Sequence, residues 1–147
     1  MPKSSDYRTL IQKYSHLFRE PPELTLEESA EHTVVKITFF FNACYYGETK
    51  MRIREWFDSN DEKVQYRYSW EKNRTKPGHI SAWENEIHEV PHHQFPDGME
   101  TDPHHHHHVP ADRTHVQENR TIHSLDKALS VVEEFILSSQ PYDGKKY

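Results

Sequence analysis

The chain has 147 residues, 33% of them hydrophobic and 29% charged, and this length suits one domain with a single core. Its 7 Phe, 8 Tyr and 3 Trp are too many for a disordered protein, and a lone cysteine, Cys44, excludes an intrachain disulfide and a cysteine-based zinc finger. No apolar stretch approaches the roughly 20 residues that span a bilayer, and residues 1–6 lack a signal-peptide core. We therefore expect a cytoplasmic protein without a membrane partner, with one domain over 1–147 and its core in 6–138.

The first predicted element is an amphipathic helix over residues 6–18. Its apolar side chains recur at helical spacing, and Pro21 and Pro22 prevent the helix from continuing. Residues 33–41 follow and are rich in β-branched and aromatic side chains on both faces. This composition predicts a strand in the interior of a sheet.

Two further segments alternate between apolar and polar residues, which predicts strands over 48–58 and 63–71. A short strand is expected near residues 80–85. The side chains expected in the core under a C-terminal helix are Met51, Ile53, Phe57, Val64, Tyr66 and Tyr68. Tight connections between these strands indicate an antiparallel meander of three or four strands.

Residues 86–110 contain four prolines and no hydrophobic period, so we expect a long histidine-rich loop. Residues 113–121 carry a weak signal for an edge strand. Ser124 then caps a second amphipathic helix over 125–137, which ends before Pro141. The sequence thus predicts an α+β fold: an antiparallel meander sheet with an N-terminal helix, a C-terminal helix and the long loop.

The formal net charge is −6, which argues against nucleic-acid binding by the protein as a whole, but the charges are unevenly distributed. Residues 50–76 carry 8 basic and 5 acidic side chains. Residues 79–108 carry six acidic side chains, no Lys or Arg, and nine of the 13 histidines. A local cationic surface therefore remains available on the strands over 48–58 and 63–71, where Arg52, Arg54 and Arg67 are expected on one face.

The histidine-rich loop supports two kinds of chemistry. Imidazoles among carboxylates favour a divalent ion such as Zn²⁺, Ni²⁺ or Cu²⁺. The candidate ligands are His92, His93, His104, His105 and His107. Without a metal, two histidines can act as general base and general acid and cleave RNA through its 2′-hydroxyl. The candidates for that role are His92, His93, His105 and His107, with Arg52, Arg54, Arg67 and Asn85 as substrate ligands.

Simpler interpretations stand beside these. The loop can be a solvated low-complexity segment that binds metal only incidentally, and the arginines can be an ordinary solvated sheet face. An internal affinity tag is a third interpretation of the histidine run. The tyrosines and Trp70 are expected to be core residues, and Cys44 a small buried hydrophobe.

The order of four short motifs resembles the TumE-type toxin family of bacterial toxin–antitoxin modules. These motifs are Ala82-Trp83-Glu84-Asn85, Pro91-His92-His93, Pro103-His104-His105-His106-His107, and Ser124-Leu125 at the start of the last helix. The chain departs from the family pattern at Ala82, where an arginine is usual, at Glu84, where an aspartate is usual, and in a longer spacing between Asn85 and Pro91. The resemblance implies a small cytoplasmic toxin that is neutralised by an antitoxin, typically one with a helix-turn-helix domain.

Three functional hypotheses follow. The first is a small ribonuclease-like toxin, with RNA as a target extrapolated from toxins of this size. The second is a metal-binding module without turnover, and the third is an interaction domain whose loop is disordered. The six carboxylates of residues 79–108 repel a polyanion, and a bound cation or protonated histidines would offset that repulsion. The sequence leaves a homo-oligomer open.

Overall fold

The structure is a computed structural model, and it describes residues 4–73, 79–85, 106–108, 116–119 and 121–142. Its central element is one antiparallel sheet in which every strand pairs with its neighbour in the sequence, in the order β1 to β7. This is the meander expected from the sequence, and together with two helices it confirms the α+β fold. The strands are β1 (Phe18–Glu28), β2 (Thr33–Phe41), β3 (Thr49–Phe57), β4 (Lys63–Lys72), β5 (His79–Glu84), β6 (His106–His108) and β7 (Val116–Glu118).

The N-terminal segment differs from the predicted helix over 6–18. The helix α1 (Ser4–Lys13) is followed by a 3-10 turn, η1 (Ser15–Leu17), and Phe18 already begins β1. Pro21 and Pro22 lie inside β1, where the register with β2 shifts between Glu20 and Glu23. An edge strand accommodates prolines because only one side of it must supply ladder hydrogen bonds. The sequence analysis missed β1 for this reason.

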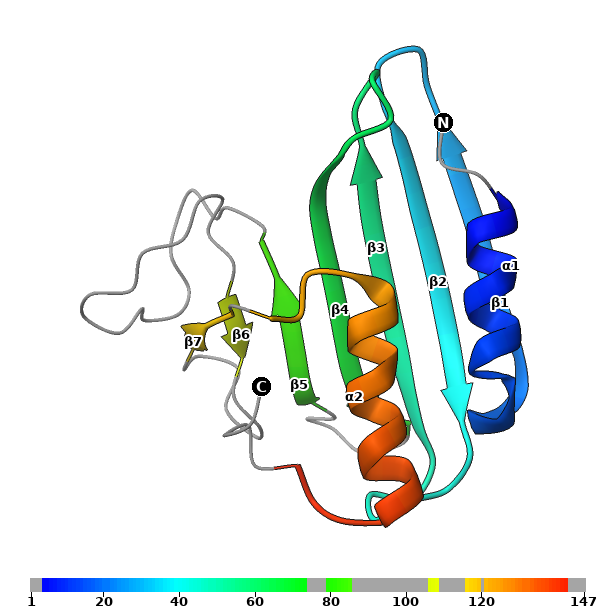
Figure 1. The fold of residues 1–147 in the computed structure, drawn as a ribbon, viewed down its shortest axis with the longest axis vertical. Helices are drawn as coiled ribbons and strands as arrows, with labels where there is room; N and C mark the ends of the chain where they lie inside the picture. The colour runs from blue at the N-terminus through cyan, green and yellow to red at the C-terminus, as the bar shows by residue number, and fades with distance from the viewer. Residues whose placement is uncertain (1–3, 74–78, 86–105, 109–115, 120, 143–147) are drawn as a thin grey trace.

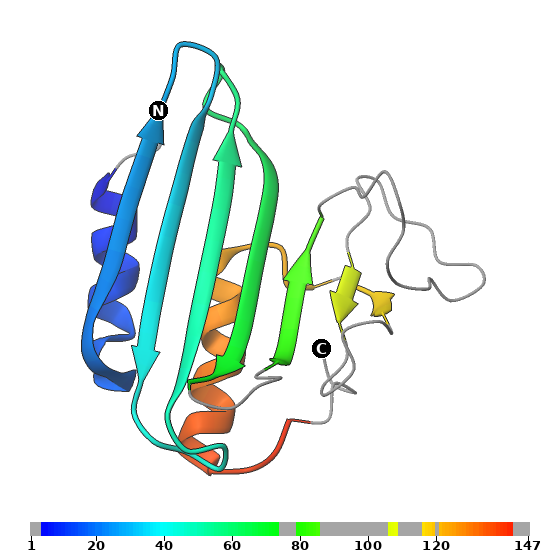
Figure 2. The ribbon, with the colours of Figure 1, turned by 180° about the vertical axis from the view of Figure 1, so that it is seen from behind.

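Both helices lie against the same face of the sheet, as Figure 1 shows, and the opposite face is free of helices when seen from behind (Figure 2). The second helix, α2 (Leu125–Ser138), begins as predicted, because the Ser124 side chain accepts a hydrogen bond from the backbone N–H of Lys127. Ser139 follows in the left-handed conformation and ends the helix two residues before Pro141.

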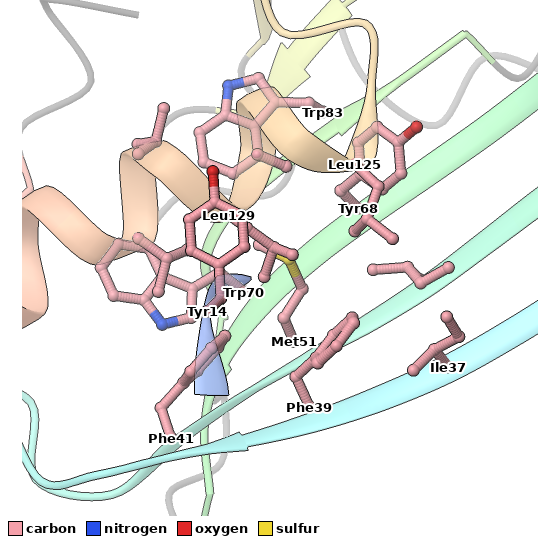
Figure 3. Close-up of a cluster of buried hydrophobic side chains, with 14 of the residues drawn as sticks. Tyr14, Ile37, Phe39, Phe41, Met51, Tyr68, Trp70, Trp83, Leu125 and Leu129 are labelled. Atoms are coloured by element: carbon pink, nitrogen blue, oxygen red, sulfur yellow. The ribbon is translucent and has the colours of Figure 1, made fainter. Parts of the chain in front are cut away.

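The core lies between the sheet and the helices. Figure 3 shows Tyr14 of the N-terminal segment and Leu125 and Leu129 of α2 meeting side chains that rise from the sheet. Among the predicted core residues, Met51, Ile53, Tyr66 and Tyr68 are buried, and Phe57 is partly buried against the same cluster. The helix 125–137 packs on antiparallel strands, as expected.

Val64 was wrongly predicted as a core residue, since 42% of it is exposed. The ladder between β3 and β4 pairs Trp56 with Gln65 and Phe57 with Lys63, so Val64 has no partner in that ladder. An extra residue of this kind is a β-bulge. A bulge interrupts the alternation on which the prediction rested.

The histidine-rich segment is not a loop throughout. Residues 106–108 form β6, which pairs with β5 on one side and with β7 on the other. β7 lies within residues 113–121, where the sequence carried a weak strand signal. Among the described residues the sheet has seven strands, where three or four were expected. Residues 86–105 and 109–115 of the predicted loop and its flank lie outside the described residues.

A cationic hollow on the uncovered face of the sheet

The helix-free face of the sheet carries a row of charged residues at directly paired positions. Lys36 on β2 lies opposite Arg54 on β3, Arg54 lies opposite Arg67 on β4, and Arg67 lies opposite Glu84 on β5. Directly paired residues of neighbouring strands share a face, and neighbouring strands are about 4.8 Å apart. The row therefore brings together three cations from segments that are well separated in the sequence.

These cations surround one shallow hollow. Its volume is about 460 Å³, and its lining is formed by Lys36, Ile37, Thr38, Arg52, Ile53, Arg54, Arg67 and Ser69. Period-2 alternation placed Arg52, Arg54 and Arg67 together on one face, and the structure does bring these three to one hollow. Lys36 is a fourth basic residue of the same hollow that the sequence analysis missed. The sequence signal that could have found it is its position between Val35 and Ile37, because alternation along a strand places Lys36 on the face opposite these two apolar residues.

Carboxylates lie within hydrogen-bond distance of Lys36, Arg52 and Arg67. Arg52 donates two hydrogen bonds to Glu71, from Nε at 3.0 Å and from Nη2 at 2.7 Å. Lys36 Nζ lies 3.0 Å from Glu27 Oε1. Arg67 Nη1 donates to Glu84 Oε2 at 2.6 Å. An anionic ligand in the hollow therefore meets guanidinium and ammonium groups that already share their charge with carboxylates, beside the exposed side chain of Arg54.

Beyond Glu84, the charged row reaches the histidine strand. His106 lies opposite Glu84 and His107 lies opposite Trp83 in the ladder between β5 and β6. The register thus brings the backbone of one predicted catalytic and metal-binding histidine, His107, within two strands of Arg67. The other four candidates, His92, His93, His104 and His105, lie outside the described residues.

Asn85, the predicted substrate ligand, follows directly after β5 and is buried. Its side-chain oxygen accepts a hydrogen bond from the Tyr66 N–H at 2.7 Å, and its Nδ2 donates to the Val64 carbonyl at 3.1 Å. Both ends of this amide therefore bind the backbone of β4 beside the bulge. These two hydrogen bonds give Asn85 a structural role. Its contact with a substrate stays a prediction.

A buried carboxylate on the helix side is a second feature that the sequence analysis missed. Glu55 of β3 is 4% exposed and accepts hydrogen bonds from Tyr7 at 2.7 Å and Tyr68 at 2.5 Å. Lys63 Nζ lies 3.3 Å from the same carboxylate and donates to the His123 carbonyl at 2.8 Å. Burial, followed by the charge of Glu55, raises the pKa of both tyrosines above the usual value. The cluster joins α1, the sheet and the segment before α2.

No group of three or more metal-ligating side chains was found among the described residues. Because only His107 of the predicted ligands belongs to the described part, and its side chain is not described, the Zn²⁺, Ni²⁺ or Cu²⁺ site stays a prediction. None of the helices in that part of the chain is long and apolar enough to cross a membrane.

The fold and the hollow define a small α+β protein whose helix-free sheet face presents clustered basic side chains. The family model described as Toxin TumE matches residues 8–140 of the chain. The match extends from α1 to just past α2 and includes the hollow and the histidine strand. The chain therefore belongs to the TumE toxin family. Searches of curated proteins and of solved structures found no significant match.

Proposed function

We propose that this member of the TumE toxin family is a small ribonuclease that binds RNA phosphates in the cationic hollow. The observation that carries the proposal is the convergence of Lys36, Arg52, Arg54 and Arg67 on one hollow of about 460 Å³. Guanidinium groups bind phosphate oxygens through two parallel hydrogen bonds. The hollow is shallow and open, which suits a polymer lying across the sheet.

The histidines supply the chemistry in this proposal. A neutral imidazole removes the proton of a ribose 2′-hydroxyl, whose oxygen then attacks the adjacent phosphorus. A second, protonated imidazole donates its proton to the departing 5′ oxygen, so the products are a 2′,3′-cyclic phosphate and a free 5′-hydroxyl. Imidazole titrates near neutrality, so both protonation states are accessible at working pH. We assign these roles to the set His92, His93, His105 and His107, with Asn85 as a further substrate ligand.

The register brings the histidine strand to the end of this row. His106 of β6 pairs with Glu84 on β5, and Glu84 pairs with Arg67, which lines the hollow, whereas His107 pairs with Trp83 and so holds a register position on the other face of the sheet. An RNA backbone bound along the row Lys36, Arg54 and Arg67 would thus run toward β6. As a toxin-family protein the chain requires a neutralising antitoxin, and we propose one with a helix-turn-helix domain and a cytoplasmic site of action.

The test is expression in bacteria without an antitoxin, together with incubation of the purified protein with a labelled RNA. Growth arrest and RNA fragments with cyclic phosphate ends are expected. His92→Gln with His93→Gln should abolish both effects, because glutamine cannot titrate near pH 7, whereas Arg52→Ala with Arg54→Ala should weaken them partly. Arg8→Ala, on the exposed face of α1, is the matched control and should leave both intact.

Circular dichroism of each variant confirms that the fold is retained. A folded double-histidine variant that still arrests growth would contradict the catalytic assignment. Arrest without RNA fragments would point instead to toxicity by binding.

A further inference from the structure

The outer strand β1 presents an open edge along half of its length. β1 stands first in the strand order, so among the described strands it pairs with β2 alone. From Glu23 to Glu28 its register with β2 is continuous, whereas Pro21 and Pro22 interrupt the preceding half. Six regular residues give a ladder of about 20 Å. Every second residue of such an edge directs its N–H and C=O away from the sheet.

Apolar and acidic side chains alternate between the two faces of this open half. Leu24 and Leu26 lie opposite Ile37 and Val35 on the helix side, yet they are 49% and 41% exposed. In Figure 1 the end of β1 extends past the first turn of α1. Glu23 and Glu27 occupy the other face, where Glu27 also pairs with Lys36 of β2 at 3.0 Å. An added strand would therefore meet leucines on one side and these carboxylates on the other.

The charge of β1 decides which strand fits. Between Phe18 and Glu28 it carries Glu20, Glu23, Glu27 and Glu28 against the single cation Arg19, a net of 1 − 4 = −3. A second copy of the chain could pair Leu24 with Leu26 across a two-fold axis at Thr25. That register would also place Glu23 opposite Glu27 twice, and like charges at directly opposed positions are destabilising. A basic strand from a different protein would place no like charges opposite Glu23 and Glu27.

We propose that the edge Glu23–Glu28 of β1 is the docking surface for the antitoxin, which adds a strand with basic residues alternating with apolar ones. Main-chain hydrogen bonds to the edge give affinity, the apolar side chains cover Leu24 and Leu26, and the basic ones meet Glu23 and Glu27. This proposal rests on membership of the toxin family and is independent of whether the toxin cleaves RNA. The edge lies two strands away from the row of arginines, beyond Lys36.

The test uses full-length protein and a short peptide of about seven residues that alternates lysine and valine. Binding is measured by titration calorimetry, and the bound segment by hydrogen exchange. Protection of the backbone amides within 23–28 is expected. A peptide of the same sequence with alternate N-methylated residues keeps the charge but cannot complete the ladder, so it should bind at least about tenfold more weakly.

Charge reversal on the edge tests the second element of recognition. Glu23→Lys with Glu27→Lys should weaken the lysine–valine peptide about tenfold, since two attractive cross-strand pairs become repulsive. Glu133→Lys with Glu134→Lys on α2 changes the net charge equally and should have little effect. Leu24→Thr with Leu26→Thr provides a second, uncharged variant that should also weaken binding.

Three results would overturn the proposal. These are equal binding of the N-methylated peptide, protection confined to segments outside 23–28, and a dimer of the unliganded protein that Leu24→Lys converts to a monomer. The last result would make the edge a contact between two copies of the chain. None of these outcomes depends on nuclease activity, so they are distinguishable from a failure of the proposed function.

Discussion

Arg67 and Glu84 face each other on β4 and β5, and Arg67 Nη1 donates a hydrogen bond to Glu84 Oε2 at 2.6 Å. The Glu84 side chain is fully buried, whereas that of Arg67 retains 24% of its exposure. A buried carboxylate thus holds one cation of the hollow in place and at the same time reduces its attraction for an anionic ligand. Stability and attraction for an anionic ligand are therefore opposed at this pair.

The first prediction follows from that opposition. Glu84→Gln should lower the free energy of unfolding by about 2 kcal/mol, because it removes the charge that compensates Arg67 in a largely buried pair, with some compensation from solvent. The same change should strengthen RNA binding, because Arg67 then meets phosphate with its full charge. Urea denaturation and filter binding measure the two effects. Glu71→Gln is the control, since the Arg52 side chain is 62% exposed and the loss of stability should stay below about 1 kcal/mol.

The second prediction concerns the salt dependence of RNA binding. If the hollow holds phosphates, Arg54→Ala should remove one contact and reduce the slope of log K against log salt by about 0.7, the value for single strands. Lys36→Ala should do the same, because Lys36 lies opposite Arg54 in the row. The exposed Arg8 is the matched control. Equal slopes for wild type, Arg54→Ala and Arg8→Ala would exclude the hollow as the phosphate site.

The sequence predicted those elements whose signal is local. The strand expected over 33–41 matches β2 residue for residue, because β-branched and aromatic side chains fill both faces of an interior strand. Ser124 caps α2 as expected. β1 was missed because its prolines and glutamates are tolerated only at a sheet edge, a position that no local pattern specifies. The bulge at Val64 was equally invisible, since it depends on how β4 pairs with β3.

The same distinction between local patterns and features that depend on strand pairing applies to the candidate site. Alternation alone placed Arg52, Arg54 and Arg67 on one face, which the structure bears out. Their pairing with Glu71 and Glu84 depends on the cross-strand register, as does the position of Lys36 beside Arg54. Register follows from long-range packing, so charge balance within a sheet face cannot be read from one strand. The predicted metal and catalytic histidines other than His107 lie outside the described residues.

The third prediction concerns the alternative to acid–base chemistry, in which the loop histidines hold a metal ion. In that case protein purified without an affinity tag should retain about one Zn²⁺, Ni²⁺ or Cu²⁺ per chain, held by His92 or His93 together with histidines of 104–107, because neutral imidazoles are good ligands for these ions. Elemental analysis measures the ion, and a chelator should lower the unfolding temperature. His16→Gln is a control outside the segment. Well under one ion per chain, with no effect of the chelator, would remove the ligand role.

The fourth prediction concerns Asp126 in the first turn of α2. The hydrogen bond from the Tyr14 hydroxyl at 2.6 Å, aided by Lys13 at 3.0 Å, lowers the pKa of this carboxyl below its usual 3.8. A lowered pKa stabilises the fold above the usual value, and this contribution is lost as the pH falls through the folded-state pKa. Asp126→Asn should therefore cost about 1 kcal/mol at pH 7, a figure reduced for solvent screening because the side chain is 47% exposed, and this cost should shrink as the pH falls through the folded-state pKa.

Acid titration of both proteins by circular dichroism checks the fourth prediction. The two unfolding free energies should converge as the pH falls. Glu62→Gln, an exposed carboxyl in the turn between β3 and β4, is the control and should leave the curve unchanged. A gap that does not narrow as the pH falls below 3.8 would show that Asp126 acts through its shape and not through its charge.

The last prediction concerns the tyrosines around Glu55. Burial raises the pKa of Tyr7 and of Tyr68 above the usual 10.0, and Glu55 adds to the rise because its carboxylate repels a phenolate. In the unfolded chain both hydroxyls ionise near pH 10, so the folded state is favoured fully below that pH and loses this advantage as the pH rises toward the folded-state values. The protein should therefore unfold above about pH 10, with phenolate absorbance rising together with the loss of ellipticity.

Tyr7→Phe should cost about 1–2 kcal/mol at pH 7, since Glu55 loses a hydrogen bond, and should make the alkaline transition less steep. Tyr45→Phe is the control, because the Tyr45 side chain is 59% exposed and lies outside the cluster around Glu55. Phenolate absorbance of Tyr7 and Tyr68 that appears near pH 10 in a still folded protein would contradict the role of the buried carboxylate.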